Sequence, residues 1–166
     1  MKLTQNKINN KFKIDYTLIS KSYLWSKKLV KVRKILKKIF LHSSYFVDKK
    51  FLQYDITFLL VNNEKIKKIN KKFSNINKST DVLTFTDSYK YKNKNIRICN
   101  IILSAETIIN EAKLMKINFY EHLTHLIIHS LLHSNGYDHD NLKNEKKMKK
   151  KEIEILVKLN INNPYA

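Results

Sequence analysis

The sequence predicts an α+β fold, an α/β sandwich in which a small mixed sheet of four strands packs with about five helices. Two observations predict this class. Short segments that alternate apolar and polar residues are interleaved with longer segments whose apolar residues recur every three or four positions. The order is strand, helix, strand, helix, two strands and three helices, without a glycine- or proline-rich linker. We therefore expect a single domain over residues 1–166.

The first half of the chain predicts two strands and two helices. Residues 11–16 alternate charged and apolar side chains, as a half-buried strand does. Apolar residues at helical spacing over 25–40 predict an amphipathic helix whose lysines face solvent, with an RNA-binding surface as the alternative for those lysines. Residues 54–60 alternate again and predict a second strand. Asn63 and Glu64 can open a short helix that runs through Lys72.

The second half predicts two strands and three helices. Residues 81–86 (DVLTFT) and 96–103 (IRICNIIL) are the strands, and the second is expected to be central because it is apolar on both faces. Ser104 can cap a helix that ends near Met115, and Asn118 can cap the next helix. The last helix is expected from about Asn141 to Leu159, with a buried face formed by Met148, Ile155, Leu156 and Leu159.

Composition predicts a soluble, cytoplasmic protein. The chain has 166 residues with 43% hydrophobic residues, which suffices for a hydrophobic core. Its clearest apolar run, Ile56–Val61, is far too short to cross a bilayer, and the N-terminal MKLTQNKINN lacks the apolar segment of a signal peptide. The single cysteine, Cys99, is consistent with a reducing compartment. No membrane partner is expected.

The net charge of +19 favours a polyanionic partner, because clustered cations bind phosphates with release of counterions. Of the 33 basic residues, however, only Arg33 and Arg97 are arginine. Abundant lysine, asparagine and isoleucine also indicate an AT-rich coding sequence, in which lysine accumulates for reasons unrelated to binding. Both explanations of the charge remain open at this point.

The histidines predict a metal site. His129 and His133 are four residues apart on a predicted helix, so both imidazoles leave the same face and can reach one cation at roughly 2.0 to 2.1 Å. A third ligand must come from elsewhere. Gly136, the only glycine, can end the helix in the left-handed conformation that glycine adopts without a Cβ penalty. The chain can then turn back and place His139 over the two helical histidines.

The spacing of these residues is that of the metzincin zinc peptidases, with one change. Those enzymes carry a glutamate after the first histidine, which acts as the general base. This chain has Ser130 at that position, and an unperturbed serine is no general base near neutral pH. The three histidines would leave an open coordination position on a zinc ion, but without an acid/base group for peptide hydrolysis.

A structural role for the histidines is the competing interpretation. Five of the six histidines lie between residues 122 and 139, and three of them surround the only glycine in a known ligand spacing, which favours the metal site. His122 and His125 lie on a neighbouring part of the helical face and can contact either a ligand or the substrate. Asp138 and Asp140 can orient a ligand imidazole or cap the final helix.

The segment HSLLHSNGYDH (residues 129–139) closely resembles the signature of the YbeY family of bacterial metal-dependent endoribonucleases, which are rRNA maturation factors. In that family the pattern is His, a small residue, two others, His, two others and then Gly-Tyr-Asp-His. STDVLTF (residues 79–85) resembles the family's P-T-D/N-V-L-S-F. The resemblance covers most of the chain from about residue 70 to 166, and its tail is similar at Met148, Glu152, Ile155 and Leu156 before NPYA.

The resemblance implies a function and a ligand set. It implies that His129, His133 and His139 hold one zinc ion per chain and act in catalysis through that metal. It also implies cleavage of single-stranded RNA, with roles at the 3′ end of small-subunit rRNA and in ribosome quality control. Such a substrate would account for the basic surface, and no dinucleotide cofactor is expected.

Two departures from the family pattern bear on activity. Where the family has Tyr-Arg this chain has Phe73 and Ser74, so the arginine expected beside the zinc is absent. Where the family has Leu-Gly-Asp-Ile this chain has Ile98, Cys99, Asn100 and Ile101. In the Ser74 region a point charge is available from Lys71, Lys72 or Lys78, although a lysine does not reproduce the fork of an arginine.

Two other functions therefore remain open. The first is a non-catalytic, ribosome-associated protein whose zinc only staples the last two helices, which Ser74 and Asn100 favour. The second is a zinc hydrolase of another substrate such as a peptide, which Ser130 disfavours.

Overall fold

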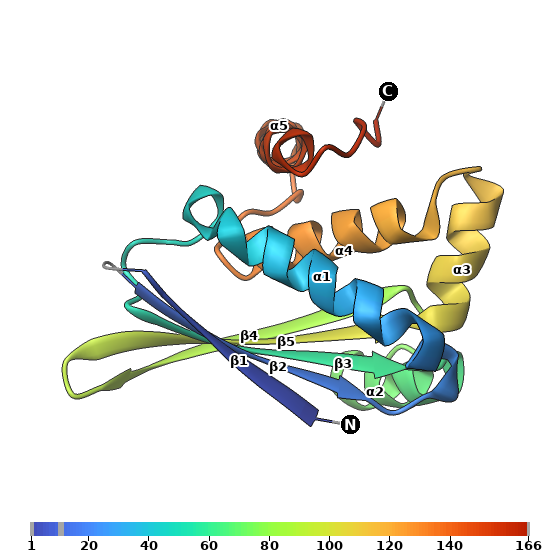
Figure 1. The fold of residues 1–166 in the computed structure, drawn as a ribbon, viewed down its shortest axis with the longest axis horizontal. Coiled ribbons are helices and arrows are strands. Elements are labelled where there is room, and N and C mark those ends of the chain that lie inside the picture. Colours follow the sequence, from blue (N-terminus) through green and yellow to red (C-terminus); the bar gives the residue numbers. More distant parts are fainter. Residues whose placement is uncertain (1, 10–11, 166) are drawn as a thin grey trace.

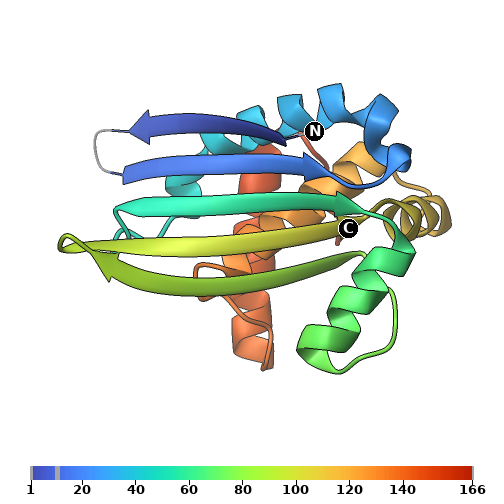
Figure 2. The same ribbon diagram turned by 90° about the horizontal axis from the view of Figure 1, so that it is seen from below.

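The computed structural model describes the backbone of residues 2–9 and all of residues 12–165. These residues form one mixed sheet in the order β1-β2-β3-β5-β4 (Figure 2). The three inner strands are parallel, and both edge strands pair antiparallel with their neighbours. The strands are β1 (Lys2–Asn9), β2 (Phe12–Ser20), β3 (Gln53–Val61), β4 (Val82–Tyr91) and β5 (Lys94–Ser104).

All four predicted strands are present, and the structure adds a fifth, β1. The segment KLTQNKIN has no regular apolar alternation, so the sequence gives no strand signal there. Its backbone pairs along the whole length of β2, from Lys2 opposite Ile19 to Asn9 opposite Phe12. Residue 11, the first of the predicted strand 11–16, lies outside the described residues, and β2 continues past that prediction to Ser20.

Five α-helices are described, which agrees with the predicted number and fold class. They are α1 (Leu29–Leu41), α2 (Asn63–Ser74), α3 (Ala105–Leu114), α4 (Phe119–His133) and α5 (Leu142–Lys158), with short 3-10 segments η1 (Tyr23–Lys28) and η2 (Ser43–Tyr45) on either side of α1. Among these residues, no helix is long and apolar enough to pass through a bilayer.

The residues that cap the helix N-termini can be compared with the helix starts predicted from the sequence. Asn118 caps α4 as expected, whereas α5 is capped by Asn141 and not by Asp138 or Asp140; in both caps the side-chain oxygen accepts a backbone N–H bond. For α2 the cap is Asn62, one residue earlier than predicted, whose side chain accepts from the Lys65 N–H at 3.0 Å. Ser104 stands at the start of α3 but makes no side-chain cap bond; its hydroxyl donates instead to Asn63 at 2.6 Å.

The molecule is layered, with α1 and α4 over one face of the sheet and α5 beyond α4 (Figure 1). The main core lies between the sheet and the first helical layer, where Tyr16, Phe40 and Phe58 pack as a cluster of aromatic rings. Burial of each such side chain contributes about 1.5 to 3 kcal/mol. This core fixes α4 against the sheet and leaves one edge of α4 to face α5.

The opposite face of the sheet carries a smaller core under α2. There Ile66 of α2 packs with Val61 of β3 and Ile102 of β5. Because Ile101 and Leu103 are buried on the other face, β5 is apolar on both sides, and its place between β3 and β4 confirms the prediction of a central strand.

Candidate metal centre

Helix α4 positions the first two histidines at the boundary between core and solvent. Most of its surface is buried, including Leu123, Ile127 and Leu131. The side chains of His129 and His133 lie on the remaining edge and are 28% and 27% exposed. The helical spacing of four residues brings the Nε2 atoms of these two imidazoles to 3.0 Å from each other.

The helix ends in the left-handed turn that the single glycine predicted. The Gly136 N–H donates to the His133 carbonyl at 3.0 Å, and the Tyr137 N–H donates to the Leu132 carbonyl at 3.1 Å, which is the pattern of a Schellman motif. Gly136 has φ +84°, and a Cβ built there would meet nothing within 4 Å. The requirement for glycine is therefore conformational rather than steric.

The value of φ explains why glycine occurs here. Five other described residues have positive φ, between 45° and 61°, and all are asparagine or lysine: Asn75, Lys92, Asn93, Lys116 and Asn160. That interval lies close to the left-handed region open to side chains, whereas 84° lies beyond it. The chain thus uses asparagine or lysine at ordinary left-handed positions and glycine at the most strained one.

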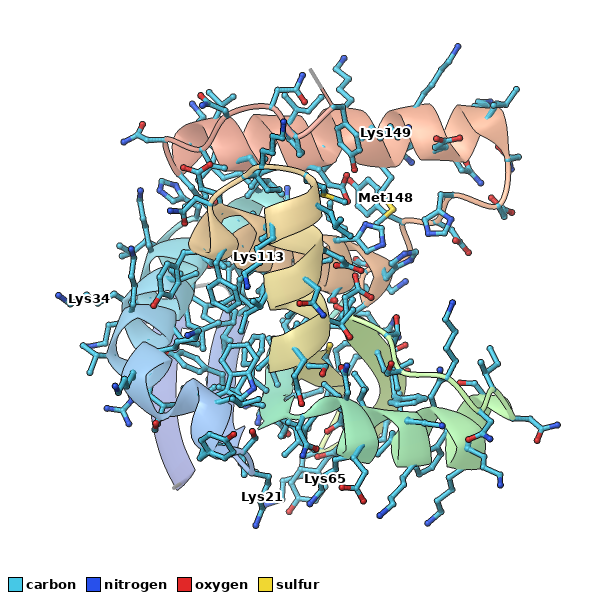
Figure 3. All side chains as sticks on the ribbon, turned by 90° about the vertical axis from the view of Figure 1, so that its right-hand side faces the viewer. Lys21, Lys34, Lys65, Lys113, Met148 and Lys149 are labelled. Carbon is cyan, nitrogen blue, oxygen red and sulfur yellow. The ribbon has the colours of Figure 1, made fainter. Side chains whose placement is uncertain are left out.

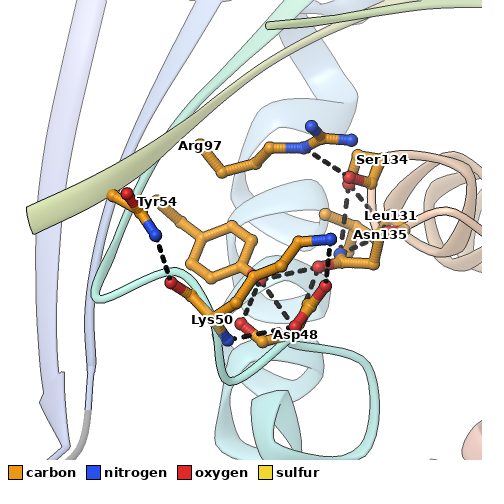
Figure 4. A network of polar contacts seen from close by, with 8 residues as sticks. Asp48, Lys50, Tyr54, Arg97, Leu131, Ser134 and Asn135 are labelled. Atoms are coloured by element: carbon orange, nitrogen blue, oxygen red, sulfur yellow. Dashed lines mark hydrogen bonds and ion pairs between the residues drawn. The ribbon is translucent and has the colours of Figure 1, made fainter. Parts of the chain in front are cut away.

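A polar network pins the end of α4 to the sheet immediately before the turn (Figure 4). Arg97 of β5 donates from Nε to the Ser134 carbonyl at 2.6 Å. The Tyr54 hydroxyl accepts from the Asp48 N–H at 2.7 Å and donates to the Asn135 side-chain oxygen at 2.6 Å. These bonds tie the residues just before the turn to two strands, β3 and β5, and to the loop before β3.

The turn brings His139 back over α4, as predicted. One ligand nitrogen from each of His129, His133 and His139 lies within 4.8 Å of the others. The rings of His129 and His139 stack with centroids 5.6 Å apart, while His133 meets both edge-on. Two nitrogens bound to one tetrahedral zinc would lie about 3.3 Å apart. Three converging imidazoles at this spacing can hold a metal ion.

A buried carboxylate orients the first of these ligands. Glu152 of α5 is 1% exposed, and its Oε1 lies 2.6 Å from Nδ1 of His129. This contact holds the proton on Nδ1 and leaves Nε2 of His129 to face the other imidazoles. The second carboxylate oxygen accepts from the hydroxyl of Tyr165, next to the C-terminus, and Nε2 of His125 lies 3.1 Å from that hydroxyl.

The surroundings favour the ionised form of Glu152 and the neutral form of His133. Burial acts to raise the pKa of Glu152, but hydrogen bonds with His125, His129 and Tyr165 outweigh it and lower that pKa to about 2. Burial lowers the pKa of His133, and the neighbouring His129 and His139 lower it further. A neutral imidazole is the form that binds a metal. The donor set therefore fits a zinc-like ion.

Of the other residues singled out around the histidine motif, some contact the groups beside His129, His133 and His139, and the others make contacts elsewhere. His125 reaches the Glu152 and Tyr165 pair, whereas His122 is buried against Glu111, with Nε2 2.9 Å from its carboxylate. The Asp138 carboxylate accepts from the His139 N–H at 2.7 Å. Asp140 accepts from the side chain of Asn144 in the first turn of α5.

Ser130 points away from the metal cluster. Its side chain is fully buried, and its hydroxyl has no hydrogen-bond partner among the described residues. It is one residue after His129, so the helix turns it by about 100° away from His129 and into the core. The buried Ser130 hydroxyl therefore makes no contact with the three histidines, and no peptidase base is present at this position.

A cavity of about 330 Å³ opens between α4 and α5 beside the histidines. Its lining residues are His129, His139, Glu145, Met148, Lys149, Glu152 and Tyr165. Ser74, Lys71, Lys72 and Lys78 do not line it: they are exposed at and after the end of α2. Phe73 beside them packs against Phe85 with the rings tilted and their centroids 5.2 Å apart, on the α2 face of the sheet.

Sequence reasoning gave no role to Tyr165 and treated Glu152 only as part of a family resemblance. One local signal was available for Glu152. It lies at helical spacing between Met148 and Ile155 on the predicted apolar face, and a carboxylate on such a face is buried only when it has partners. Tyr165 gave no comparable signal, because its contact depends on how the C-terminal tail folds back.

An α+β sandwich that gathers three imidazoles beside a cavity is an arrangement suited to a metal-dependent hydrolase. The family model described as Endoribonuclease YbeY matches residues 6–160. The chain belongs to this family of endoribonucleases.

Similar proteins span most of the chain. The Endoribonuclease YbeY of Pelagibacter ubique is 38% identical over 144 residues, 84% of this chain and 91% of its own length. That of Ehrlichia chaffeensis is 34% identical over 144 residues, 86% of this chain and 91% of its own length. That of Bartonella bacilliformis is 39% identical over 115 residues, 68% and 72% of the two chains.

A solved structure shares the fold. The solution structure of the Thermotoga maritima protein TM1509 superposes with a TM-score of 0.53 at 22% identity and covers 91% of this chain and 95% of that one. The predicted fold class is confirmed by this likeness, and the sheet of the described residues has one strand more than the four predicted.

Proposed function

We propose that this protein is a single-strand-specific, metal-dependent endoribonuclease that holds one zinc ion through His129, His133 and His139. The proposal places its work in the cytoplasm, in maturation of the 3′ end of small-subunit rRNA and in ribosome quality control. The observation that carries it is the convergence of three imidazoles beside a cavity, in a chain of the endoribonuclease YbeY family.

The chemistry assigned to the site follows from its residues. A bound zinc ion supplies Lewis acidity toward a phosphoryl oxygen and toward a hydrolytic water. Glu152 keeps Nε2 of His129 aimed at the ion, and the Gly136 turn keeps His139 over the pair. The cavity between α4 and α5 gives the scissile phosphate access from one side. Exposed lysines bind the remaining phosphates of the strand.

A non-catalytic, ribosome-associated protein with a zinc staple is the second candidate. It is favoured by the position of Ser74, which is exposed at the end of α2 and does not line the histidine cavity. In the family pattern this position holds an arginine. A peptide hydrolase has less support, because Ser130 is buried on the core side of α4.

One experiment separates these functions. The zinc-loaded protein is incubated with single-stranded RNA, with double-stranded RNA and with an unstructured polypeptide, and His133→Ala serves as the control. We expect cleavage of single-stranded RNA alone and no cleavage by the variant. Absence of cleavage by the metal-replete protein would favour the non-catalytic protein with a structural zinc, and cleavage of the polypeptide would favour the peptide hydrolase.

The salt dependence of RNA binding tests the role of the lysines. If the net charge of +19 is used in binding, the logarithm of the affinity should fall steeply and linearly with the logarithm of salt concentration, with little dependence on base sequence. Filter binding or fluorescence anisotropy between low and physiological ionic strength measures this slope. If the affinity did not change with salt concentration, the high lysine content would reflect the AT-rich coding sequence and not RNA binding.

A further inference from the structure

We propose that Lys149 of α5 binds the scissile phosphate at the metal cavity, in the role that an arginine at position 74 has in the family pattern. This inference rests on the proposed function, since it names the group that holds the substrate of that reaction. Lys149 lines the cavity together with His129 and His139. Of the described residues that line it, Lys149 is the only lysine or arginine.

The helical register of α5 places this lysine beside the ligands. Glu145, Met148, Lys149 and Glu152 occupy one face of the helix because they are separated by three or four positions. Met148 and Glu152 are buried toward α4, and Glu152 touches His129. Figure 3 shows Met148 and Lys149 together on α5. Lys149 lies next to the buried residues Met148 and Glu152 on the helix surface, at the rim of the cavity.

Two contacts hold the Lys149 ammonium at this rim. Its Nζ lies 2.6 Å from Oε1 of Glu145 and 5.0 Å from the centroid of the Tyr165 ring. Its side chain remains 43% exposed, so a ligand can reach the ammonium from solvent. An ammonium has three donors, and the bond to Glu145 uses one of them. Tyr165 in turn donates to Glu152, which links the lysine's position to the group that orients His129.

The chemistry of phosphoester cleavage gives this charge a use. Negative charge accumulates on the phosphoryl oxygens during the reaction, and a positioned cation next to the metal stabilises it. The lysines near Ser74 are exposed at and after the end of α2 and do not line the cavity. Lys149 does line the cavity, and its ammonium would bind a phosphate as a single compact charge, without the bidentate geometry of an arginine guanidinium. Glu145 competes with the phosphate for the Lys149 ammonium, which limits the affinity of Lys149 for the phosphate.

The test compares matched variants on the same helix of the full-length chain. Lys149→Gln removes the charge at the cavity, and Lys150→Gln removes the same charge from an exposed position that does not line it. Lys149→Arg keeps the charge and adds a fork. Glu145→Gln removes the competing carboxylate. Each variant is measured for zinc content, for the affinity of the metal-depleted protein for an eight-nucleotide single-stranded RNA, and for single-turnover cleavage when zinc-loaded.

We expect Lys149→Gln to lower the cleavage rate about 10- to 100-fold and to weaken RNA binding, because a charge-assisted contact to phosphate is lost. Lys150→Gln should change either quantity less than about twofold, as a screened surface charge does. Lys149→Arg should retain or exceed the parent rate. Glu145→Gln should bind RNA more tightly. Zinc content should be the same in all five proteins.

The outcomes separate this inference from the proposed function. Equal effects of Lys149→Gln and Lys150→Gln would overturn the role of Lys149 while leaving the nuclease intact. Loss of zinc from Lys149→Gln would also overturn it, since the residue would then act through the metal site. If the parent protein cleaves no RNA but Lys149→Gln alone weakens RNA binding, the proposed nuclease fails and the assignment of Lys149 to phosphate binding stands.

Discussion

Four of the five described α-helices are followed by a left-handed residue, and of two of them, α2 and α4, only the α4 end gathers a candidate site. After α2 the left-handed residue is Asn75, with φ 58°, and residues 71–78 are all exposed. After α4 it is Gly136, with φ 84°. The α4 end is bonded to β3, β5 and the loop before β3, and α5 lies across it.

The comparison shows that a tight helix end is a way to reverse the chain but does not by itself make a site. At the α2 end, the chain turns into solvent and carries Ser74 and lysines. At the α4 end, the same reversal occurs against a packed helix, so His139 returns to His129 and His133 rather than to water. Replacing residues at the two ends tests which differences matter.

The largest effect is expected for Gly136→Val. A β-branched residue at φ 84° is strained by about 1 to 3 kcal/mol, and relief of that strain would move His139 away from the other two histidines. Zinc affinity, measured by competition with a chelator, should fall about 10- to 100-fold although no ligand is removed. Gly136→Asn should fall between the parent and the valine variant. Full affinity in Gly136→Val would contradict the role of the turn.

A smaller loss is expected for Glu152→Gln. The amide keeps an acceptor for His129 Nδ1 but lacks the negative charge, so zinc affinity should fall about tenfold, the low end of the range for groups that orient a metal ligand. Glu154→Gln on the exposed side of α5 is the matched control, because it removes the same charge away from the site. Calorimetric titration with zinc compares the two, and equal affinities would leave Glu152 a purely structural residue.

At the α2 end, Ser74→Arg should raise the cleavage rate rather than lower it. A well-positioned hydrogen-bond donor can raise a cleavage rate about 10²- to 10³-fold. An arginine at an exposed helix end is poorly positioned, so the rate should rise by only about fivefold. Zinc content should not change. Single-turnover cleavage of one single-stranded RNA by both proteins at equal zinc occupancy measures the effect. Equal rates would mean that an arginine at this exposed helix end does not reach the substrate.

The smallest effect is expected for Asn75→Gly. Glycine adopts φ 58° without a Cβ penalty, and the residue is exposed, so the free energy of unfolding should change by no more than about 0.5 kcal/mol. Zinc affinity should equal that of the parent. Denaturant unfolding and chelator competition measure both quantities. A loss of zinc in this variant would show that the two helix ends are coupled, against the distinction drawn between them.

The sheet illustrates what local patterns miss. The β4–β5 hairpin continues to Tyr91 and Lys94, well beyond the predicted end at residue 86. Its turn residues Lys92 and Asn93 both have positive φ, but lysine gives no turn signal comparable to the glycine usual in such hairpins. Strand β1 was likewise invisible, because its existence depends on pairing with β2 rather than on its own alternation.

The sequence alone determined the helix that carries His129 and His133, the reversal at Gly136 and the return of His139. These features are set within about ten residues by helical periodicity and by the conformational freedom of glycine. Only the tertiary structure decided what surrounds them. Glu152 lies 23 positions from His129, and Tyr165 lies 40 from His125. Their contacts exist because the packing of α5 and the tail on α4 brings them there, and no spacing within a single helix encodes that packing.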